Sequence, residues 1–230
     1  HEKKKDPPTM GGILMLFSML TAMFLWMDLR HSFTLILFIT TVWLGSLGAY
    51  DDYLKLKYQN AKGLSGRKKL LAQLFLVVVI SSYLLCPAIT SAIHMGEWFV
   101  PPTAKEFIYQ GDFLQPTTQY VQQNSLTTLE YITRIYVPFN KGVLCSFTGL
   151  GTLFLFVFFF FVITGSSNAV NLTDGLDGLA SGCMIMVASA FALIAFISNN
   201  VVFARYLHIL YIEGSGEVAI YLCSLVGACL

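Results

Sequence analysis

Long apolar stretches separated by short polar segments follow one another along this chain. A helix needs roughly 20 apolar residues to cross a hydrocarbon core of about 30 Å. Five stretches approach that length, namely residues 11–27, 33–50, 70–93, 143–163 and 179–197. A sixth apolar run begins near Val218 and reaches Leu230. The pattern predicts an all-α polytopic membrane protein, a single transmembrane domain over residues 1–230 with about five complete transmembrane helices and one truncated helix.

Composition and the chain ends add to this picture. Hydrophobic residues make up 56% of the chain and charged residues only 12%, whereas about a quarter of the residues of a soluble domain are charged. The formal net charge is +1, and no basic stripe alternates with stacking aromatic residues, so we expect no nucleic-acid partner. The chain has no initiating Met and stops inside an apolar run. We therefore expect a fragment of a longer protein.

The placement of Lys and Arg predicts the orientation. If the five spans alternate in direction, the N-terminal segment, residues 51–69 and residues 164–178 share one side of the membrane. That side holds nine of the chain's 14 Lys and Arg residues: Lys3, Lys4, Lys5, Lys55, Lys57, Lys62, Arg67, Lys68 and Lys69. Because short cytoplasmic loops carry an excess of positive charge, we expect 51–69 and 164–178 to be cytoplasmic loops.

The long segment at residues 94–142 falls on the opposite, extracytoplasmic side. It contains four prolines among mixed polar and aromatic residues and has no strong helical period. We expect short strands or an interfacial segment there. The segment carries no candidate chemistry.

A pair of aspartates follows the second apolar stretch directly. Asp51 and Asp52 are adjacent, and Lys55 lies about one helical turn further on. Ionised carboxylates at a membrane boundary are costly unless they are solvated, paired or used. Neighbouring helical residues point about 100° apart, so two separate roles are more natural for these carboxylates than a shared one. The alternative is a purely structural helix end, in which Asp52 and Lys55 form a weak exposed pair.

A second polar motif, NAVNLTDGLDGLASG, lies between the fourth and fifth apolar stretches. Its amides and carboxylates recur every three residues, at Asn168, Asn171, Asp174 and Asp177. Interposed glycines let backbone N–H groups approach a ligand closely. The Asn and Asp side chains offer oxygen ligands for Mg²⁺ and hydrogen-bond partners for phosphate and base groups. The motif favours a phosphorylated or nucleotide ligand, and its structural alternative is an Asx-rich turn that caps a helix at Asp177.

A third motif, KKKDPPTMGG, precedes the first apolar stretch. It places Lys4, other lysines and the hydroxyl of Thr9 just outside the membrane. These groups fit contacts to a phosphorylated substrate, but lysines in this position also anchor a chain to anionic lipid headgroups. The motif leaves both interpretations open.

Four motifs together carry a resemblance to a known family. PTMGG spans residues 8–12, GAYDDYLK residues 48–55, GLSGRKK residues 63–69 and NAVNLTDGLDGLA residues 168–180. In these motifs, in their order and in the intervening spans, the chain resembles the bacterial phospho-MurNAc-pentapeptide translocases of the polyprenyl-phosphate N-acetylhexosamine-1-phosphate transferase superfamily. The resemblance covers nearly the whole chain, although the family's later metal-binding aspartate and His-rich loop have no counterpart before Leu230.

The resemblance implies an Mg²⁺-dependent phosphoglycosyl transferase of the bacterial plasma membrane, with 51–69 and 164–178 as active-site loops facing the cytoplasm. Such an enzyme transfers phospho-MurNAc-pentapeptide from UDP-MurNAc-pentapeptide to undecaprenyl phosphate, giving lipid I and UMP in peptidoglycan synthesis. The implied partners are these two substrates and membrane lipids, and a homodimer is left open.

The resemblance also implies residue roles. Asp51 and Asp52 are expected to be catalytic and Asn171 to bind the metal. Substrate contacts are expected from Lys4, Thr9, Lys55, Asn168, Asp174 and Asp177. Covalent attack by an aspartate and direct attack by the lipid phosphate both remain open. We favour direct attack, because a phosphate monoester has a second pKa of about 6 and is mostly dianionic at neutral pH.

Three other functions are compatible with parts of the pattern. A sister enzyme would transfer GlcNAc-1-phosphate from UDP-GlcNAc to the same lipid. A transporter would use its Asp and Asn residues as an ion path, but these residues fall at the ends of spans rather than in their middle. A non-catalytic membrane remnant is expected if the reading frame stops after Leu230.

Overall fold

The computed structural model describes residues 11–58, 63–110, 120–136, 143–173, 178–207 and 209–230. Among these residues, four helices are long and apolar enough to cross a membrane: α2 (Ser32–Tyr58), α3 (Gly66–Leu85), α6 (Gly151–Thr173) and α7 (Leu179–Ser198). Two further apolar helices are shorter, α1 (Gly11–Trp26) and α9 (Ser215–Cys229). The prediction of a helical, polytopic membrane protein is confirmed.

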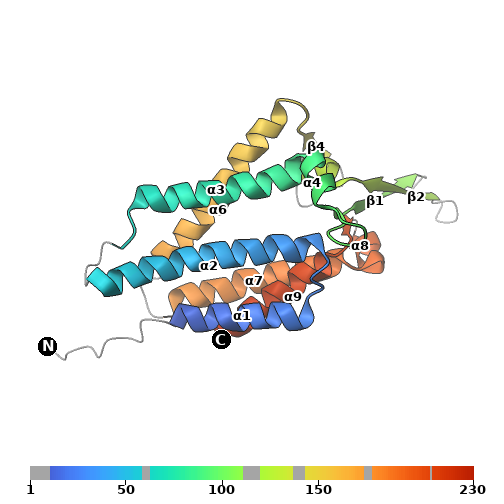
Figure 1. Cartoon of the computed structure of the whole chain (residues 1–230). Coiled ribbons are helices and arrows are strands. Elements are labelled where there is room, and N and C mark those ends of the chain that lie inside the picture. The colour runs from blue at the N-terminus through green and yellow to red at the C-terminus, as the bar shows by residue number, and fades with distance from the viewer. Residues whose placement is uncertain (1–10, 59–62, 111–119, 137–142, 174–177, 208) are drawn as a thin grey trace.

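Packing joins these helices in two groups (Figure 1). α9 packs against α1, α2 and α7, and α3 packs against α6. α7 and α9 are in contact, and the small side chains of Ala188 and Ala192 on α7 and Ala219 on α9 are buried, as is usual where two helices approach closely. Contacts of α2 with α3 and of α6 with α7 connect the two groups.

Large apolar side chains cover the outside of the helices. Leu71 of α3, Phe161 of α6 and Phe191 of α7 are each more than half exposed. Apolar surface of this extent suits lipid rather than water, and a helix satisfies its own backbone hydrogen bonds, as a hydrocarbon environment requires. The outer surface of the helices is therefore the lipid-facing surface.

Two helices extend further than the apolar pattern predicts. α2 continues to Tyr58 and α6 to Thr173, so much of the segments 51–69 and 164–178, expected to be loops, is helical. No Gly or Pro interrupts α2 after Asp51, and the hydroxyls of Thr164 and Ser166 donate to carbonyls of their own helix. Apolar patterning marks where a helix can cross the membrane, whereas helix propensity and local hydrogen bonds decide where it ends.

Three of the expected spans differ from the structure. The stretch 70–93 divides into α3 and α4 (Pro87–Ile93), because Pro87 begins a new helix and cannot continue the preceding one. The stretch 143–163 begins as the strand β4 (Val143–Ser146), and α6 starts only at Gly151. The 16 residues of α1 cover about 24 Å. The described residues therefore contain four, not five, full-length candidate spans.

Short strands and helices gather at one end of the helices (Figure 1). β1 (Ala104–Gln110) pairs antiparallel with β2 (Tyr120–Leu126) and β5 (Tyr211–Ile212), and β3 (Arg134–Tyr136) pairs with β4. α5 (Thr128–Ile132) and α8 (Val201–Leu207) complete this region. The prediction of short strands within 94–142 is confirmed. We call this region the strand end, formed by residues 27–31, 94–110, 120–136, 143–146, 201–207 and 209–217.

At the opposite end lie the end of α2, the start of α3, the end of α6 and the start of α7 (Figure 1). The described parts of three sequence motifs, at residues 48–55, 63–69 and 168–180, meet there, although they lie far apart in the chain. We call this region the motif end, formed by residues 44–58, 63–73, 167–173 and 178–184.

Candidate active site

The aspartate pair at the end of α2 is organised around one lysine. Lys55 Nζ lies 2.7 Å from Asp51 Oδ2 and 3.1 Å from Asp52 Oδ1. Helical residues three and four apart lie on one face, so a single ammonium group reaches both carboxylates. The contact between Asp52 and Lys55 that belongs to the structural alternative is present, and the shorter contact between Asp51 and Lys55 was not predicted.

Residues 63–65 fold back over Asp51. The backbone N–H of Leu64 donates to Asp51 Oδ1 at 2.6 Å. Gly63 has a φ of +50°, in the left-handed region that glycine adopts without a steric penalty. A Cβ at this position would lie 2.5 Å from Asp51 Oδ1 and 2.9 Å from Lys55 Cε. Both the backbone conformation and the close approach therefore require glycine at the start of the GLSGRKK motif.

The two aspartates differ in their access to a ligand. The side chain of Asp51 is 15% exposed and that of Asp52 is 59% exposed. Both oxygens of Asp51 accept hydrogen bonds, one from Lys55 and one from the Leu64 N–H, whereas Asp52 accepts only from Lys55 among the described residues. Asp51 thus anchors the lysine and the turn, while Asp52 keeps an exposed oxygen.

A cavity of about 520 Å³ lies at the motif end, with walls from α1, α2, α3, α6, α7 and α9. This volume is within the range of about 300 to 1,000 Å³ that is usual for small-molecule sites. Its polar lining includes Lys69, Ser167, Asn171 and Ser181, and Gly48 lies on the α2 side. Three of the sequence motifs therefore contribute to one cavity.

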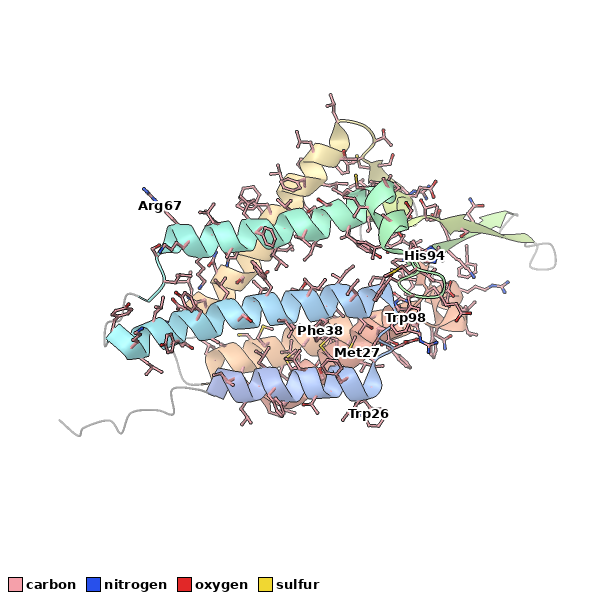
Figure 2. The ribbon with its side chains drawn as sticks, in the orientation of Figure 1. Trp26, Met27, Phe38, Arg67, His94 and Trp98 are labelled. Carbon is pink, nitrogen blue, oxygen red and sulfur yellow. The ribbon has the colours of Figure 1, made fainter. Side chains whose placement is uncertain are left out.

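Lys69 and Asn171 are two polar side chains of this cavity, and the charge of Lys69 also acts on Asp51 across the site. Lys69 forms no ion pair with another described residue, and Asn171 makes no side-chain hydrogen bond to one. Arg67, two residues before Lys69, instead points away from α3 (Figure 2). Lys69 was not among the predicted site residues, although its place in the GLSGRKK motif was a usable signal. A cation and an amide on one wall can bind a phosphorylated ligand.

Asn168 occupies a different position from Asn171. It does not line the cavity but exchanges long hydrogen bonds with Gln73 of α3, at 3.4 and 3.5 Å. Gln73 is fully buried and was also not predicted as a site residue. A single Gln within the apolar run that follows Lys69 was the signal for it.

The predicted residues divide into three sets. Asp51, Asp52 and Lys55 meet in one cluster, which borders the cavity without lining it. Asn171 lines the cavity, and Asn168 lies behind it. Four predicted substrate contacts fall outside the described residues, namely Lys4, Thr9, Asp174 and Asp177. Their roles stay predictions.

The chemistry of the cavity wall is compatible with Mg²⁺. No group of three or more His, Cys, Asp or Glu side chains within the described ranges could hold a metal ion. Mg²⁺ commonly takes only one or two protein oxygens and completes its shell with water and substrate phosphates. The side-chain oxygen of Asn171 has no hydrogen-bond partner among the described residues, so it fits such a ligand.

Known proteins resemble the chain along its whole length. The chain is 54% identical over 230 residues to a protein named phospho-N-acetylmuramoyl-pentapeptide-transferase from Protochlamydia amoebophila. This match covers all of this chain and 56% of the length of that relative. Proteins of the same name from Pelagibacter ubique and Endomicrobium trichonymphae are 38% and 37% identical, over 99% and 100% of this chain and 51% and 52% of their own lengths. The chain thus spans about half the length of these relatives.

A family model gives the assignment of the chain as a whole. The model for glycosyl transferase family 4 matches residues 34–230. The match includes the aspartate cluster, the turn over Asp51 and the cavity residues Lys69 and Asn171. The chain belongs to glycosyl transferase family 4.

Proposed function

We propose that this chain acts in the transfer of phospho-MurNAc-pentapeptide from UDP-MurNAc-pentapeptide to undecaprenyl phosphate, giving lipid I and UMP. One observation carries the proposal: Lys69 and Asn171, which form no ion pair or side-chain hydrogen bond with another described residue, line one cavity beside the cluster of Asp51, Lys55 and Asp52. The name of the relatives, phospho-N-acetylmuramoyl-pentapeptide-transferase, supports this choice of substrate.

In the proposed reaction, a lipid phosphate oxygen attacks the phosphorus that carries MurNAc. A new P–O bond joins the two phosphates, and the bond between that phosphorus and the UMP oxygen breaks. The reacting groups repel each other because both are anionic. Cations that screen this charge while holding the groups in line would lower the barrier. Lys69 on the cavity wall and Lys55 beside it are suited to this task.

The surroundings of the aspartates favour direct attack by the lipid phosphate over a covalent aspartyl intermediate. Both oxygens of Asp51 already accept hydrogen bonds, and such an engaged carboxylate is a weak nucleophile. The lipid phosphate is mostly dianionic at neutral pH and needs little help from a base. Asp51 would then hold Lys55 and the turn at Gly63, and the more exposed Asp52 would orient the incoming groups.

Mg²⁺ is the proposed cofactor, with Asn171 as one of its ligands. When bound, the ion would neutralise charge on the phosphates. Asp174 and Asp177 of the same motif are proposed contacts to the nucleoside or phosphates. Lys4 and Thr9 are proposed contacts from the N-terminal segment.

The proposed location is the bacterial plasma membrane, with the motif end facing the cytoplasm. The excess of Lys and Arg on that side supports the orientation. A single cysteine introduced at exposed Arg67 in an otherwise cysteine-free protein tests it. We expect a membrane-impermeant maleimide to label Arg67→Cys in inverted vesicles and not in intact spheroplasts. Labelling in spheroplasts alone would reverse the orientation.

A competition between donors tests the substrate. The protein encoded by the reading frame that contains this chain is supplied with undecaprenyl phosphate, UDP-MurNAc-pentapeptide and UDP-GlcNAc, and the lipid products are separated. We expect only the MurNAc product. Formation of the GlcNAc product alone would instead assign the sister reaction.

Chelation tests the cofactor in the same assay. We expect EDTA to abolish transfer and added Mg²⁺ to restore it, because phosphoryl transfer without charge neutralisation is strongly disfavoured. Full activity in EDTA would contradict the proposal that the reaction needs a metal ion, and with it the proposed role of Asn171 as a metal ligand.

A further inference from the structure

Gln73 is a polar residue in the part of α3 that faces other helices. Its side chain is fully buried, and burial of an amide is costly unless the amide is hydrogen-bonded. Gln73 Nε2 donates to Ser167 Oγ at 3.0 Å and lies 3.5 Å from Asn168 Oδ1, while Asn168 Nδ2 lies 3.4 Å from Gln73 Oε1. The contact with Ser167 is the shortest of the three. All of them connect α3 to α6.

The positions of these residues relate the contact to the cavity. Gln73 lies four residues after Lys69 on α3, and Ser167 lies four residues before Asn171 on α6. Residues four apart lie one above the other on a helix face. α3 starts at the motif end and α6 finishes there, so Gln73 and Ser167 are both one turn deeper than Lys69 and Asn171. Ser167 itself lines the cavity, as Lys69 and Asn171 do.

A second contact holds α3 at the same level on its other side. Trp43 Nε1 of α2 donates to the carbonyl of Ala72, next to Gln73, at 2.9 Å. The Trp43 ring also packs against Phe75, with the ring centroids 4.9 Å apart. α3 is therefore fixed against both α2 and α6 one turn below the cavity.

We propose that Gln73 is a positioning residue, which sets the register of α3 against α6 so that Lys69 and Asn171 line one cavity. This inference rests on the proposed function for its effect on transfer. Asn168 then acts as a partner of Gln73 rather than as a direct contact of the substrate. Neither Gln73 nor Asn168 touches the reacting groups, and both act through the side chains one turn above them.

Substitutions that break and rebuild the amide contact test the kinetic effect. We expect Gln73→Leu to lower kcat by about 10- to 100-fold, because a shift of about 1 Å between reacting groups can have this effect, and to change KM by less than about threefold. Adding Asn168→Leu to Gln73→Leu is expected to cause no further loss of kcat. The exchange variant Gln73→Asn with Asn168→Gln keeps two amides and their combined length, and it is expected to recover most of kcat.

A matched control comes from the same turn of α6. Ser166 donates only to the carbonyls of Val162 and Ile163 in its own helix. We expect Ser166→Ala to keep kcat within about twofold, since it removes a hydroxyl without touching α3. A further large loss on adding Asn168→Leu to Gln73→Leu would instead make Asn168 a direct substrate contact and overturn the positioning role.

Cross-linking measures the register without any substrate. Cysteines replace Lys69 and Asn171 in the full protein after substitution of the native cysteines, Cys86, Cys145, Cys183, Cys223 and Cys229. A short bis-maleimide is expected to join the pair efficiently with Gln73 present, at least several-fold less with Gln73→Leu, and efficiently again in the exchange variant. Equal yields in all three proteins would overturn the inference. A Gln73-dependent yield in a protein without transferase activity would uphold the register and reject the proposed function.

Discussion

The motif end and the strand end use the same kinds of polar residue for different purposes. At the strand end, several partners are distant in sequence: Arg134 pairs with Glu106 at 3.1 Å, Glu217 accepts from the backbone N–H of Asp28 at 3.0 Å, and Arg30 lies over the ring of Trp98. Figure 2 shows Trp98 and Met27 at this end. These contacts connect separate segments, and the polar groups in them find their partners within the protein.

At the motif end, the charged groups pair locally or not at all. Lys55 pairs with the neighbouring Asp51 and Asp52, while Lys69 and Asn171 line the cavity without an ion pair or side-chain hydrogen bond to another described residue. Exposed local ion pairs stabilise a fold by about 1 kcal/mol or less. The exposed Asp52–Lys55 pair therefore contributes little to folding, and the charge of Lys69 is available to a ligand in the cavity. We therefore expect substitutions at the motif end to affect transfer and substitutions at the strand end to affect stability.

The largest loss of transfer is expected for substitutions in the aspartate pair. Asp51→Asn or Asp52→Asn should lower transfer by about 100- to 1,000-fold, the range found when one preorganised electrostatic group is removed from an active site. Membrane insertion should be unchanged. The measurement is initial rate per inserted protein, with Glu106→Gln at the strand end as the control. The control should retain transfer while lowering the midpoint of thermal unfolding. Near wild-type rates in both aspartate variants would remove the pair from the chemistry.

A smaller effect is expected for the lysine of the cavity. Lys69→Ala removes a charge-assisted contact to phosphate, worth about 1.5 to 3 kcal/mol, so transfer should fall by roughly 10- to 100-fold. Arg67→Ala is the matched control, because Arg67 belongs to the same motif and points away from α3 (Figure 2). Equal rates for the two variants would mean that the cavity wall does not contact the substrate.

The turn over Asp51 provides the next test. Gly63→Ala places a Cβ 2.5 Å from Asp51 Oδ1 and strains a residue at φ +50°, so the contact from the Leu64 N–H should be lost. We expect transfer to fall by about tenfold, in line with one hydrogen bond to a charged group. Gly66→Ala is the control, since no atom lies near its Cβ position. A full rate for Gly63→Ala would show that Asp51 needs no second donor.

Local patterns in the sequence predicted the parts of the fold that depend on local forces. The apolar stretches located the four long helices, because hydrophobic length is what a membrane crossing requires. The Asp52–Lys55 contact followed from helical spacing, and the same rule, applied at four residues, also covers Asp51–Lys55. The extension of α2 to Tyr58 was predicted only in part: Asp51 to Lys55 were treated with helical spacing, but the segment 51–69 as a whole was expected to be a loop because its apolar pattern ends at Tyr50.

Contacts between distant segments could not be predicted in this way. The bond from the Leu64 N–H to Asp51 depends on the backbone turn at Gly63. The bond from Gln73 to Ser167 joins residues 94 apart and depends on how α3 packs on α6. The buried Gln signalled that some partner was needed, but not which one. Likewise, nothing local to Tyr211 and Ile212 indicates that they pair with β1.

The smallest effect is expected in the capping box of α5 at the strand end. Glu130 Oε2 accepts from the Thr127 backbone N–H at 2.8 Å and from its hydroxyl at 2.9 Å, and these hydrogen bonds lower the pKa of Glu130 from its ordinary value of 4.5. Because the pKa is lower in the folded than in the unfolded state, the contribution is complete above about pH 4.5 and is lost as the pH falls through the folded-state pKa.

This linkage gives a measurable difference in acid. Glu130→Gln should make the unfolding midpoint less dependent on pH below 4.5, with transfer unchanged at neutral pH. Glu97→Gln is the control, since Glu97 is also exposed at the strand end and makes no hydrogen bond to another described residue. Identical acid profiles for the two variants would mean that the capping box contributes nothing. A loss of transfer in Glu130→Gln would break the separation between the two ends, since the strand end would then influence the chemistry at the motif end.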